Sequence, residues 1–573
     1  MTALAALALL AAAPEPAGYE ARVVSWGLAQ VGARPDPAPE GKRIEAIWVA
    51  SEDIVAPADP WPALANAVHV KTRELTVRRE LLFEVGEPYS ADVAAETERN
   101  LRSLFILAVA RVVAVEGSAP DRVGVVVVTK DLWSIRLDSA YTLVGPLLQY
   151  LRIRPSEENF LGRDKTLQLD FRLKLDTLSF GQLYYDPRLW GSRLELLEQA
   201  DVVVNRASQQ LEGSFGTVQV DRPLYSLQTE WGFSVLGQWD IEPTRVYQGA
   251  VLWAPFGTIP LVYNARTEGA VAVYTRSFGR YWKTNVSVGL GGHVRKYAPP
   301  VDPQWTDAQR AELTQDYLPW SETATYLTAI VGTYEADYRV LRDVDSFALS
   351  EDFQMGHSAS ATLRWSEPAW GSPLHFFEAG VTARYRAFRH DDFFSVQAAA
   401  TARYMPGVVA AGIAAPWVNQ RFAAELRNYF PALGRWGRVV VRALFDERRN
   451  DLNHGYDFLG GDLGLRGTAP DVLVGTRELL ANVEFRSRPV EFFTVHAGLV
   501  LFYDAGSAFD TSPNLVHAVG LGIRALFPQL DIQPVRIDFG YAFNGPVTPF
   551  LNQFSSSFGQ VTDIRPSFLD APL

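Results

Sequence analysis

The sequence predicts a mainly β protein, an antiparallel transmembrane β-barrel of about 16 strands that follows one small α+β domain. Three observations lead to this prediction. From Trp133 onward, polar and apolar residues alternate with a period of two almost everywhere. Aromatic residues make up 12% of the chain although its mean hydropathy is only -0.03, which is typical of alternating strands. Residues 43–131 instead combine helical and strand patterns.

The composition excludes several classes of protein. The chain of 573 residues has no cysteine, so it forms no disulfide, thiolate metal site or lipid-modified cysteine. Its formal charge of -12 argues against nucleic acid as a partner, because duplex binding needs a basic surface. No segment reaches the roughly 18 uncharged apolar residues that a membrane helix needs.

Residues 1–18, MTALAALALLAAAPEPAG, predict an export signal, because residues 3–13 form an uninterrupted Ala/Leu run. No Lys or Arg precedes this run, and Pro14 disfavours cleavage directly after Ala13. A disordered alanine-rich start therefore remains the alternative. Residues 19–42 are rich in Pro, Ala and Gly and are expected to form a linker.

Residues 43–131 are expected to form a small soluble domain with the order β-α-α-β-β. RIEAIWV has the pattern of a strand, and the helical stretch ELTVRRELLFEV ends at Gly86. Ser90 can cap a second helix, and ARVVAVEG and RVGVVVVTKD read as a strand pair. One face of that second helix carries residues spaced by four, four and three positions, which are Val93, Thr97, Leu101 and Leu104.

Residues 132–563 are expected to form the barrel, with a tail at 564–573. In KTLQLDFRLKLD, residues 165–176, one strand face is apolar and the other is polar at every position. The same alternation places Glu484 and Asp504 on the lumen side of their strands. Long loops at 238–266 and 296–322 would lie outside the cell, and the short turns would face the periplasm. The pattern between 238 and 435 leaves sixteen or eighteen strands in total open.

No catalytic constellation is recognisable, so we expect neither an enzyme nor a bound cofactor or metal. The chain contains no H-E-x-x-H, no P-loop, and no G-x-S-x-G elbow at a strand–helix turn. His390 lies beside acidic residues in RHDDF, and a solvated loop tip explains this segment better than a metal site. A hydrolase built on a barrel is kept only as a third hypothesis.

The glycine-rich stretch GGDLGLRG, residues 460–467, has the composition of a phosphate-binding loop but not its context. It follows a strand and a polar loop, and no helix begins after it, so the helix N-terminus that binds phosphate is missing. The four glycines instead permit tight turns at positive φ in a crowded lumen. They are Gly460, Gly461, Gly464 and Gly467.

Several motifs in order resemble the bacterial outer-membrane assembly and translocation barrels, the superfamily of BamA, TamA and the two-partner-secretion transporters. Leu465-Arg466-Gly467-Thr468 is similar to the (V/I/L)-R-G-(F/Y) tetrad of an inward loop, with Thr468 in place of an aromatic residue. The other matching stretches are FYDAG from Phe502 to Gly506, ANVEFRSRP from Ala481 to Pro489, ENFLGRD with Asn159 and Gly162, YYDPRLWG with Asp186 and Pro187, and FSSSFGQ at 554–560. The 43–131 segment resembles one POTRA domain, on the positions of Gly86, Tyr89 and Leu101, with Leu104 on the same helix face.

The resemblance implies a periplasmic receiver domain and a barrel that inserts or translocates polypeptides across the outer membrane. Arg466 would latch the inward loop, with Asp504 as first partner and Glu484 as second, beside Phe502 and Gly506. A hairpin turning near 489–491 would set Glu484 several residues lower than Asp504, too far apart for one arginine to reach both without a shift in register. Alternatively the two acids merely solvate a polar lumen.

The resemblance also implies a weak seam between the first strand, near 133–145, and the last, near 553–561, where a client strand could pair. The expected partners are outer-membrane lipids with lipopolysaccharide, unfolded outer-membrane or secreted polypeptides, and periplasmic or lipoprotein accessories, but no nucleic acid. A passive porin-like or structural barrel of the same fold is the alternative. The choice between insertion and secretion, and the identity of the client, stay open.

Overall fold

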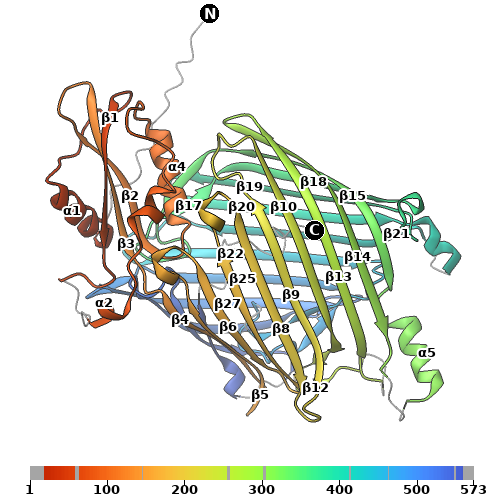
Figure 1. Ribbon diagram of the computed structural model, residues 1–573. Coiled ribbons are helices and arrows are strands. Elements are labelled where there is room, and N and C mark those ends of the chain that lie inside the picture. Colours follow the sequence, from red (N-terminus) through yellow and green to blue (C-terminus); the bar gives the residue numbers. More distant parts are fainter. Residues whose placement is uncertain are drawn as a thin grey trace, which may run out of the picture.

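The computed structural model describes residues 18–57, 64–144, 146–248, 250–254, 259–300, 305–411, 415–461, 464–546 and 550–558. These residues form a small N-terminal α/β domain and one large, strongly curved antiparallel sheet (Figure 1). The predicted export signal, except for residue 18, lies outside the described residues. The end of the predicted last strand and the predicted tail lie outside them as well.

The N-terminal domain contains a three-stranded sheet in the order β1-β3-β2. β1 (Arg43–Glu52) runs parallel to the central strand β3 (Arg122–Asp131), and β2 (Leu107–Glu116) runs antiparallel to it. Between β1 and β2 lie the short helices α2 (Leu64–Val68) and α3 (Glu74–Arg78), then the longer α4 (Ala91–Arg102). The predicted strands and helices are therefore present, with α2 as an addition.

The predicted linker at 19–42 is wrong for more than half of its length, because Tyr19–Val31 is a helix, α1. Tyr19 and Val23 recur at a spacing of four and are buried against the face of the sheet that α4 leaves uncovered. Gly27 continues this stripe, and a side chain there would collide with Val128 of β3. Apart from Gly27, the Pro and Gly residues that suggested a linker come at and after Gly32, which ends the helix at φ 67.

The large sheet contains about 20 strands within the part of the chain that the structure describes, with β26 continuing β25 along the same edge of β27, so the predicted count of sixteen or eighteen is too low. Tight turns explain the difference: His390 and Asp391, both at positive φ, form a two-residue hairpin turn inside a stretch whose alternation continues on both sides. The strands are β4 Ile135–Val144, β5 Leu147–Glu157, β6 Thr166–Leu173, β7 Thr177–Asp186, β8 Glu195–Asn205, β9 Leu211–Arg222, β10 Trp231–Arg245, β13 Val262–Phe278, β14 Trp282–Ala298, β15 Glu322–Glu335, β18 Gly356–Ser366, β19 Phe376–Arg389, β20 Asp392–Tyr404, β21 Trp417–Tyr429, β22 Gly437–Arg449, β25 Arg477–Ser487, β26 Val490–Phe492, β27 Val495–Phe509, β28 Val516–Leu526, β29 Val535–Ala542 and β30 Phe554–Phe558.

The strand order brings the last strand, β30, beside the first, β4. Going round the sheet from β4 to β30, antiparallel registers are described for the successive pairings. None is described between β30 and β4. The sheet is thus continuous from β4 round to β30 among the described residues.

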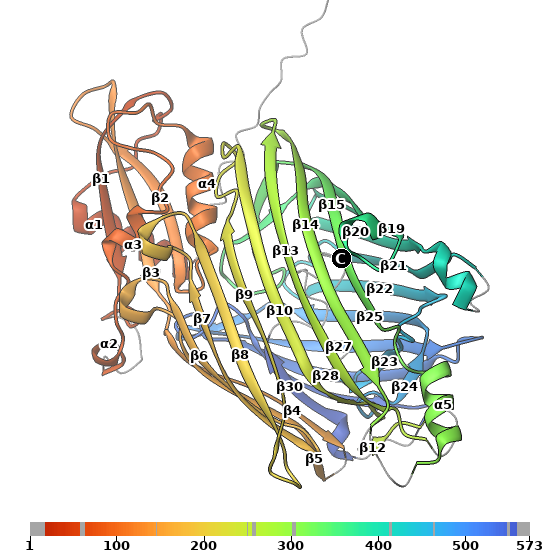
Figure 2. The same ribbon diagram turned by 45° about the vertical axis from the view of Figure 1, so that its right-hand side comes forward.

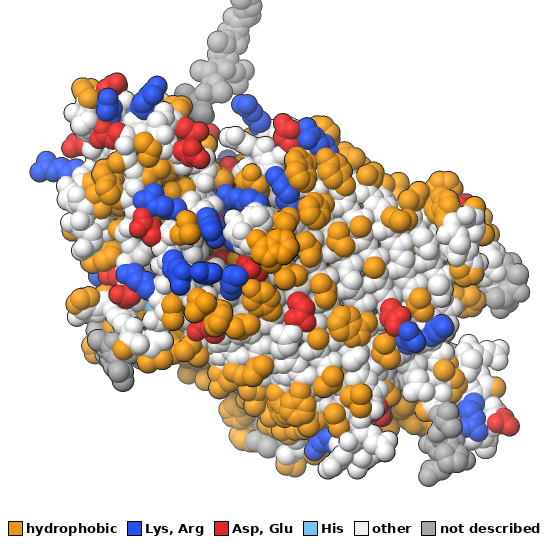
Figure 3. All heavy atoms as spheres, in the orientation of Figure 1, with side chains coloured by type: hydrophobic (Ala, Val, Ile, Leu, Met, Phe, Trp, Pro, Cys, Tyr) orange, Lys and Arg blue, Asp and Glu red, His pale blue; other side chains and the backbone are white. Residues whose placement is uncertain are grey.

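The outer face of the sheet is apolar, and the inner face is polar. On β27 and β28, Leu499, Leu501, Leu521 and Ile523 are exposed outward, whereas Asp504 points inward and is buried. Hydrophobic side chains are spread over the visible strand surface, where charged side chains are few (Figure 3). Tryptophans gather at both strand ends: Trp231 and Trp282 near the N-terminal domain, and Trp365, Trp370 and Trp417 at the far end. Aromatic girdles of this kind are typical of membrane barrels.

The connections at the two ends of the sheet differ in length. The far end carries residues 246–261, with β11 (Tyr247–Gln248) and β12 (Val251–Leu252), and residues 299–321, with α5 (Asp307–Asp316). Thr306 and Gln309 form a capping box at the start of α5. Figure 2 shows α5 at the end of the sheet opposite the N-terminal domain. Among the described residues, no helix is long and apolar enough to cross a membrane.

Candidate functional site

The connection between β22 and β25, residues 450–476, folds back against the inner face of the sheet; we call it the inward loop. It contains the short strands β23 (Asp457–Leu459) and β24 (Leu473–Gly475). Leu465 is fully buried in a cluster with Leu444, Leu459, Leu480 and Val516. The four glycines have the positive φ angles that the sequence predicts, 145° at Gly460, 62° at Gly461, 109° at Gly464 and 81° at Gly467.

Arg466 is 1% exposed and contacts both acids that the sequence assigned to it. Its Nε and Nη2 donate to the two carboxylate oxygens of Asp504, each over 2.8 Å, which is bidentate pairing. Its backbone N–H also donates to Asp504, over 3.2 Å. Nη1 donates to Oε1 of Glu484 over 2.7 Å. One side chain therefore ties the loop to two strands of the wall.

The register of β25 with β27 explains why one arginine reaches both acids. The expected hairpin turn near 489–491 is wrong, because β26 and β27 pair as far as Phe492 with Val495. Asp504 therefore lies opposite Asn482, and Glu484 lies opposite Phe502, only two residues along. Inward side chains two residues apart on neighbouring strands are close enough to share a partner.

The two other predicted wall residues, Phe502 and Gly506, shape the space around Arg466. The Phe502 ring lies under the guanidinium, with Cζ 3.6 Å from the ring centroid, a cation–π contact. Behind the ring, a side chain at Gly520 would collide with Phe502. Gly506 leaves room for Leu459 of the inward loop, because a Cβ there would lie 2.8 Å from a Leu459 methyl.

Thr468, which departs from the aromatic residue of the tetrad, closes the loop on itself. Its hydroxyl donates to the Leu465 carbonyl over 2.7 Å and accepts from the Gly461 N–H over 3.1 Å. The loop is thus held internally by a hydrogen-bonded threonine, where an aromatic side chain would have packed against its surroundings. Arg466 is unaffected by this departure, because its contacts are all with the wall.

Sequence reasoning missed three wall residues at the site. Asp538 of β29 lies 3.5 Å from Arg466 Nη1 and pairs with Arg524 over 2.6 Å. Asn482 donates to the Gly464 carbonyl over 2.6 Å and to Asp504 over 2.7 Å. Gly540 faces Gly467 so closely that a Cβ on either would overlap the other's backbone, at 2.8 and 2.4 Å. The alternation of VRIDFGYA placed Asp538 and Gly540 on one face and could have found both.

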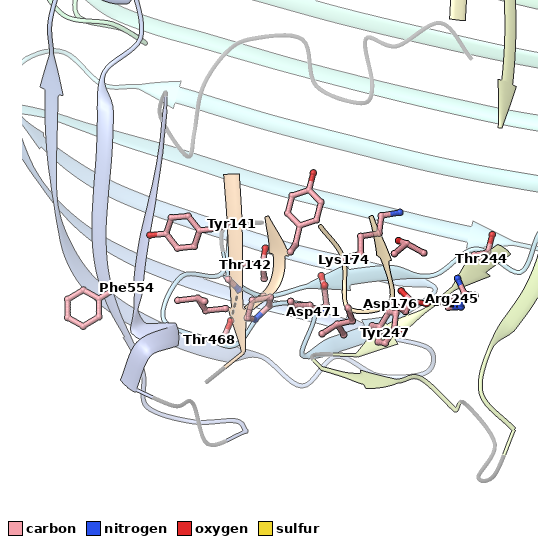
Figure 4. A pocket seen from close by; sticks show the side chains of 18 of the residues that line it. Tyr141, Thr142, Lys174, Asp176, Thr244, Arg245, Tyr247, Thr468, Asp471 and Phe554 are labelled. Carbon is pink, nitrogen blue, oxygen red and sulfur yellow. Dashed lines mark hydrogen bonds and ion pairs between the residues drawn. The ribbon is translucent and has the colours of Figure 1, made fainter. Parts of the chain in front are cut away.

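A cavity of about 510 Å³ lies between the inward loop and the first strands. Its lining includes Arg466, Gly467 and Thr468 from the loop, Tyr141 of β4 and Phe554 of β30. Figure 4 shows Tyr141 and Phe554 on one side of this space, with Lys174, Asp176 and Arg245 farther along it. The cavity therefore adjoins both the inward loop and the junction of the first and last strands.

The predicted turn residues connect the sheet to the N-terminal domain. Asn159 donates to the Thr72 hydroxyl over 2.9 Å, and the Gly162 carbonyl accepts from the Arg73 N–H over 3.0 Å. In the next turn, Asp186 accepts from Lys165 over 2.6 Å, and Pro187 is buried. The first turn therefore docks on the segment before α3, and the second reaches the domain through Arg188, which pairs with Glu80.

The predicted core residues of the N-terminal domain lie around α4 and β1. Tyr89 and Leu101 are buried, and Leu104 is half-buried against the same cluster. Gly86 has a φ of 97° and donates its N–H to the Ile44 carbonyl over 2.8 Å, which begins the return of the chain along β1.

At the junction of domain and sheet, three buried residues have the identity of a catalytic triad. His69 Nε2 lies 2.9 Å from Asp131, and its Nδ1 lies 3.4 Å from the Ser134 hydroxyl. Ser134 and Asp131 are both buried, and Asp131 also accepts from the Thr72 N–H over 2.7 Å. With no exposed nucleophile, this arrangement can fix the junction but offers no access to a substrate.

The connection between β15 and β18, residues 336–355, is long although it lies at the domain end, where short turns were expected; we call it the mouth loop. It contains β16 (Tyr338–Leu341) and β17 (Glu351–Gln354) and packs on Phe393, Tyr429 and Val440 of the inner face. On the domain side, Arg102 of α4 pairs with both oxygens of Asp352 over 2.7 and 2.8 Å. Figure 1 shows β17 beside α4.

The mouth loop also reaches the Arg466 cluster. The Val344 carbonyl accepts from Arg486 over 2.9 Å, and Arg486 in turn donates to Glu484 over 2.9 Å. Burial lowers the pKa of Arg102, but pairing with Asp352 and Glu98 outweighs this and raises its pKa above the ordinary value. The mouth loop is thus tied to α4 at Asp352 and to the Arg466 cluster at Val344.

No family model and no curated protein matches the chain. Among solved structures, BamA from Haemophilus ducreyi lacking POTRA domains 1-3 is similar at 12% identity, over 92% of this chain and 88% of that one, with a TM-score of 0.31. CdiB from Acinetobacter baumannii is similar at 11% identity, over 90% and 73%, with a TM-score of 0.39. CdiB from Escherichia coli is similar at 9% identity, over 92% and 79%, with a TM-score of 0.41.

BamA and CdiB represent the barrel superfamily that the motifs resemble. At these identities and TM-scores the similarity decides nothing about function. The function is therefore inferred from the residues of this chain.

Proposed function

We propose that this protein is an outer-membrane barrel that inserts or translocates unfolded polypeptides, with its N-terminal domain in the periplasm. The apolar outer face and the tryptophans at both strand ends suit a sheet that is surrounded by lipid. Such a sheet must close, because every backbone group in lipid needs a partner. In this proposal the junction of β4 and β30 is the closing seam.

The observation that carries the proposal is the position of the cavity. It is lined by Tyr141 and Phe554 from the two strands of the junction and by Arg466 from the inward loop. A strand of a client that paired with the edge of β4 would enter this cavity. The ion pairs of Arg466 would hold the loop in its resting place while the seam opens.

Two loops argue against the alternative, a passive porin. The inward loop lies inside the sheet against its inner face, where Arg466 and Leu465 are both buried. The mouth loop is fixed at the domain end by the Arg102–Asp352 pair. A steady pore would need both loops displaced, whereas a transporter that opens on demand needs them held at rest.

Depletion of the protein in its host should lower the level of at least one outer-membrane barrel or secreted protein, because clients would fail to assemble or cross. Quantitative proteomics of the envelope and of the medium would measure this. Complementation with the intact gene should restore the level. Unchanged proteomes would contradict the proposed function and favour a structural barrel.

Arg102→Gln should raise the ion conductance of the reconstituted protein, because the mouth loop loses its bidentate partner on α4. Planar-bilayer recordings would measure the change as more frequent open events. Arg78→Gln is the matched control, since Arg78 pairs with Glu74 in the same domain on the exposed surface. Equal recordings from the two variants would show that the mouth loop does not obstruct the lumen.

A further inference from the structure

A second cavity, of about 480 Å³, lies where the N-terminal domain meets the turns after β5 and β7. Five cationic side chains line it, but only one acid, Asp186. The cations are Arg73, Arg79, Arg163, Lys165 and Arg188. Figure 3 shows Lys and Arg side chains gathered where the domain adjoins the strands. The cavity therefore carries an excess of positive charge in a chain whose net charge is negative.

Two of these cations are already neutralised. Lys165 pairs with Asp186 over 2.6 Å, and Arg188 pairs with Glu80 of the domain. Arg73, Arg79 and Arg163 have no acidic partner among the described residues, and all three are exposed. Three guanidinium groups that line one cavity without an acidic partner can receive an anion, which would offset their mutual repulsion.

The rim of the cavity has the properties of a membrane interface. Trp190, which lines the cavity, is 88% exposed. Leu161 in the preceding turn is exposed as well, and both residues have positive φ, 54° and 59°, which is rare for bulky side chains. Tryptophan beside basic residues is typical of the level of lipid headgroups.

We propose that this basic cavity binds the phosphodiester headgroup of an anionic phospholipid in the leaflet that faces the periplasm. Arginine matches a phosphate group with two parallel N–H donors, which favours it over other cations at such a site. Arg73 and Arg79 belong to the domain and Arg163 to a barrel turn, so one headgroup bridges the two parts. This proposal rests on the membrane placement of the proposed function.

Phospholipid retention tests the assignment. The protein is reconstituted with equal amounts of phosphatidylglycerol and phosphatidylethanolamine, released, and analysed by native mass spectrometry. Wild type should retain phosphatidylglycerol preferentially. Each of Arg73→Gln, Arg79→Gln and Arg163→Gln should weaken this binding about fivefold, and the triple variant more. A matched triple variant at Arg206, Arg266 and Arg435, which lie elsewhere on the surface, should retain the preference.

Heat-modifiable mobility on gels reports independently whether each variant is folded and inserted. A wild type that fails to insert would overturn the membrane placement and, with it, the lipid site. An inserted triple variant that keeps the wild-type preference would overturn the lipid site alone. The lipid site would also be overturned if the protein bound an octaglutamate peptide through these arginines but retained the two phospholipids equally. The cavity would then be a site for acidic peptide.

Discussion

Arg466→Ala should lower the free energy of unfolding by about 3–5 kcal/mol, the usual effect of removing one partner from a buried ion pair. Asp504 loses two charge-assisted hydrogen bonds from the guanidinium, and Glu484 loses one. Both acids stay buried beside Asp538, so their mutual repulsion adds to the loss. Urea unfolding of the protein in lipid vesicles, followed by tryptophan fluorescence, measures the change.

Arg449→Ala is the matched control for this variant. Arg449 pairs with Glu447 over 2.9 Å, but its side chain is mostly exposed, so its removal should cost less than about 1 kcal/mol. The barrel of the Arg466 variant should still assemble, because the registers of the wall do not involve this side chain. Equal unfolding curves for the two variants would mean that Arg466 does not latch the loop.

Gly540→Val should displace the inward loop without removing any charge. Its Cβ would lie 2.8 Å from the Gly467 nitrogen and 3.0 Å from the Arg466 carbonyl carbon, closer than packed atoms tolerate. Overpacking of this kind costs about 1–3 kcal/mol. If the loop relieves it by leaving the wall, the population of the displaced loop rises roughly fivefold to a hundredfold.

Cysteine labelling measures the position of the loop, because the native chain contains no cysteine. A cysteine introduced by Leu465→Cys sits at a fully buried position and should react with a maleimide only when the loop is displaced. Labelling should be faster with Gly540→Val than without it. Gly237→Val is the control, since a Cβ at Gly237 of β10 would meet nothing within 4 Å. Equal labelling rates in both backgrounds would show that the Gly467–Gly540 contact does not hold the loop.

The alternation of the sequence was sufficient to place Glu484 and Asp504 on the inner face, because a period of two has only two phases. The positive φ angles of the glycines in 460–467 could be predicted, because glycine adopts such angles without strain. The tetrad at 465–468 identified Arg466 as the residue of interest. The register between β25 and β27 was not predictable. Alternation determines which face of the sheet a side chain occupies, but not which residue of the neighbouring strand lies opposite it. The register depends on where the hairpin turns. The turn lies at Phe493, which has a φ of 56° although phenylalanine rarely occupies such turns, so the sequence did not indicate it.

Other features depend on contacts between distant segments. Helix α1 forms because Tyr19 and Val23 find an uncovered face of the small sheet, which the Pro and Gly content of 19–42 obscures. In sequence the mouth loop looks like two short strands of the wall. Only its packing against Tyr429 and the ion pair between Arg102 and Asp352 distinguish it from wall strands. The close approach of Gly467 and Gly540 joins residues 73 positions apart, and no local pattern signals it.

The central claim, that polypeptides pass the junction of β4 and β30, is tested most directly by site-specific photocrosslinking in cells. A photoreactive residue replaces Leu137 of β4, which is 67% exposed, or Leu290 of β14, which is 55% exposed on a strand far from the junction in the sheet order. Both positions face outward, so both should crosslink to lipid equally. The proposed function predicts polypeptide adducts at Leu137 and none at Leu290. The absence of polypeptide adducts at both positions, or equal adducts at the two, would contradict it.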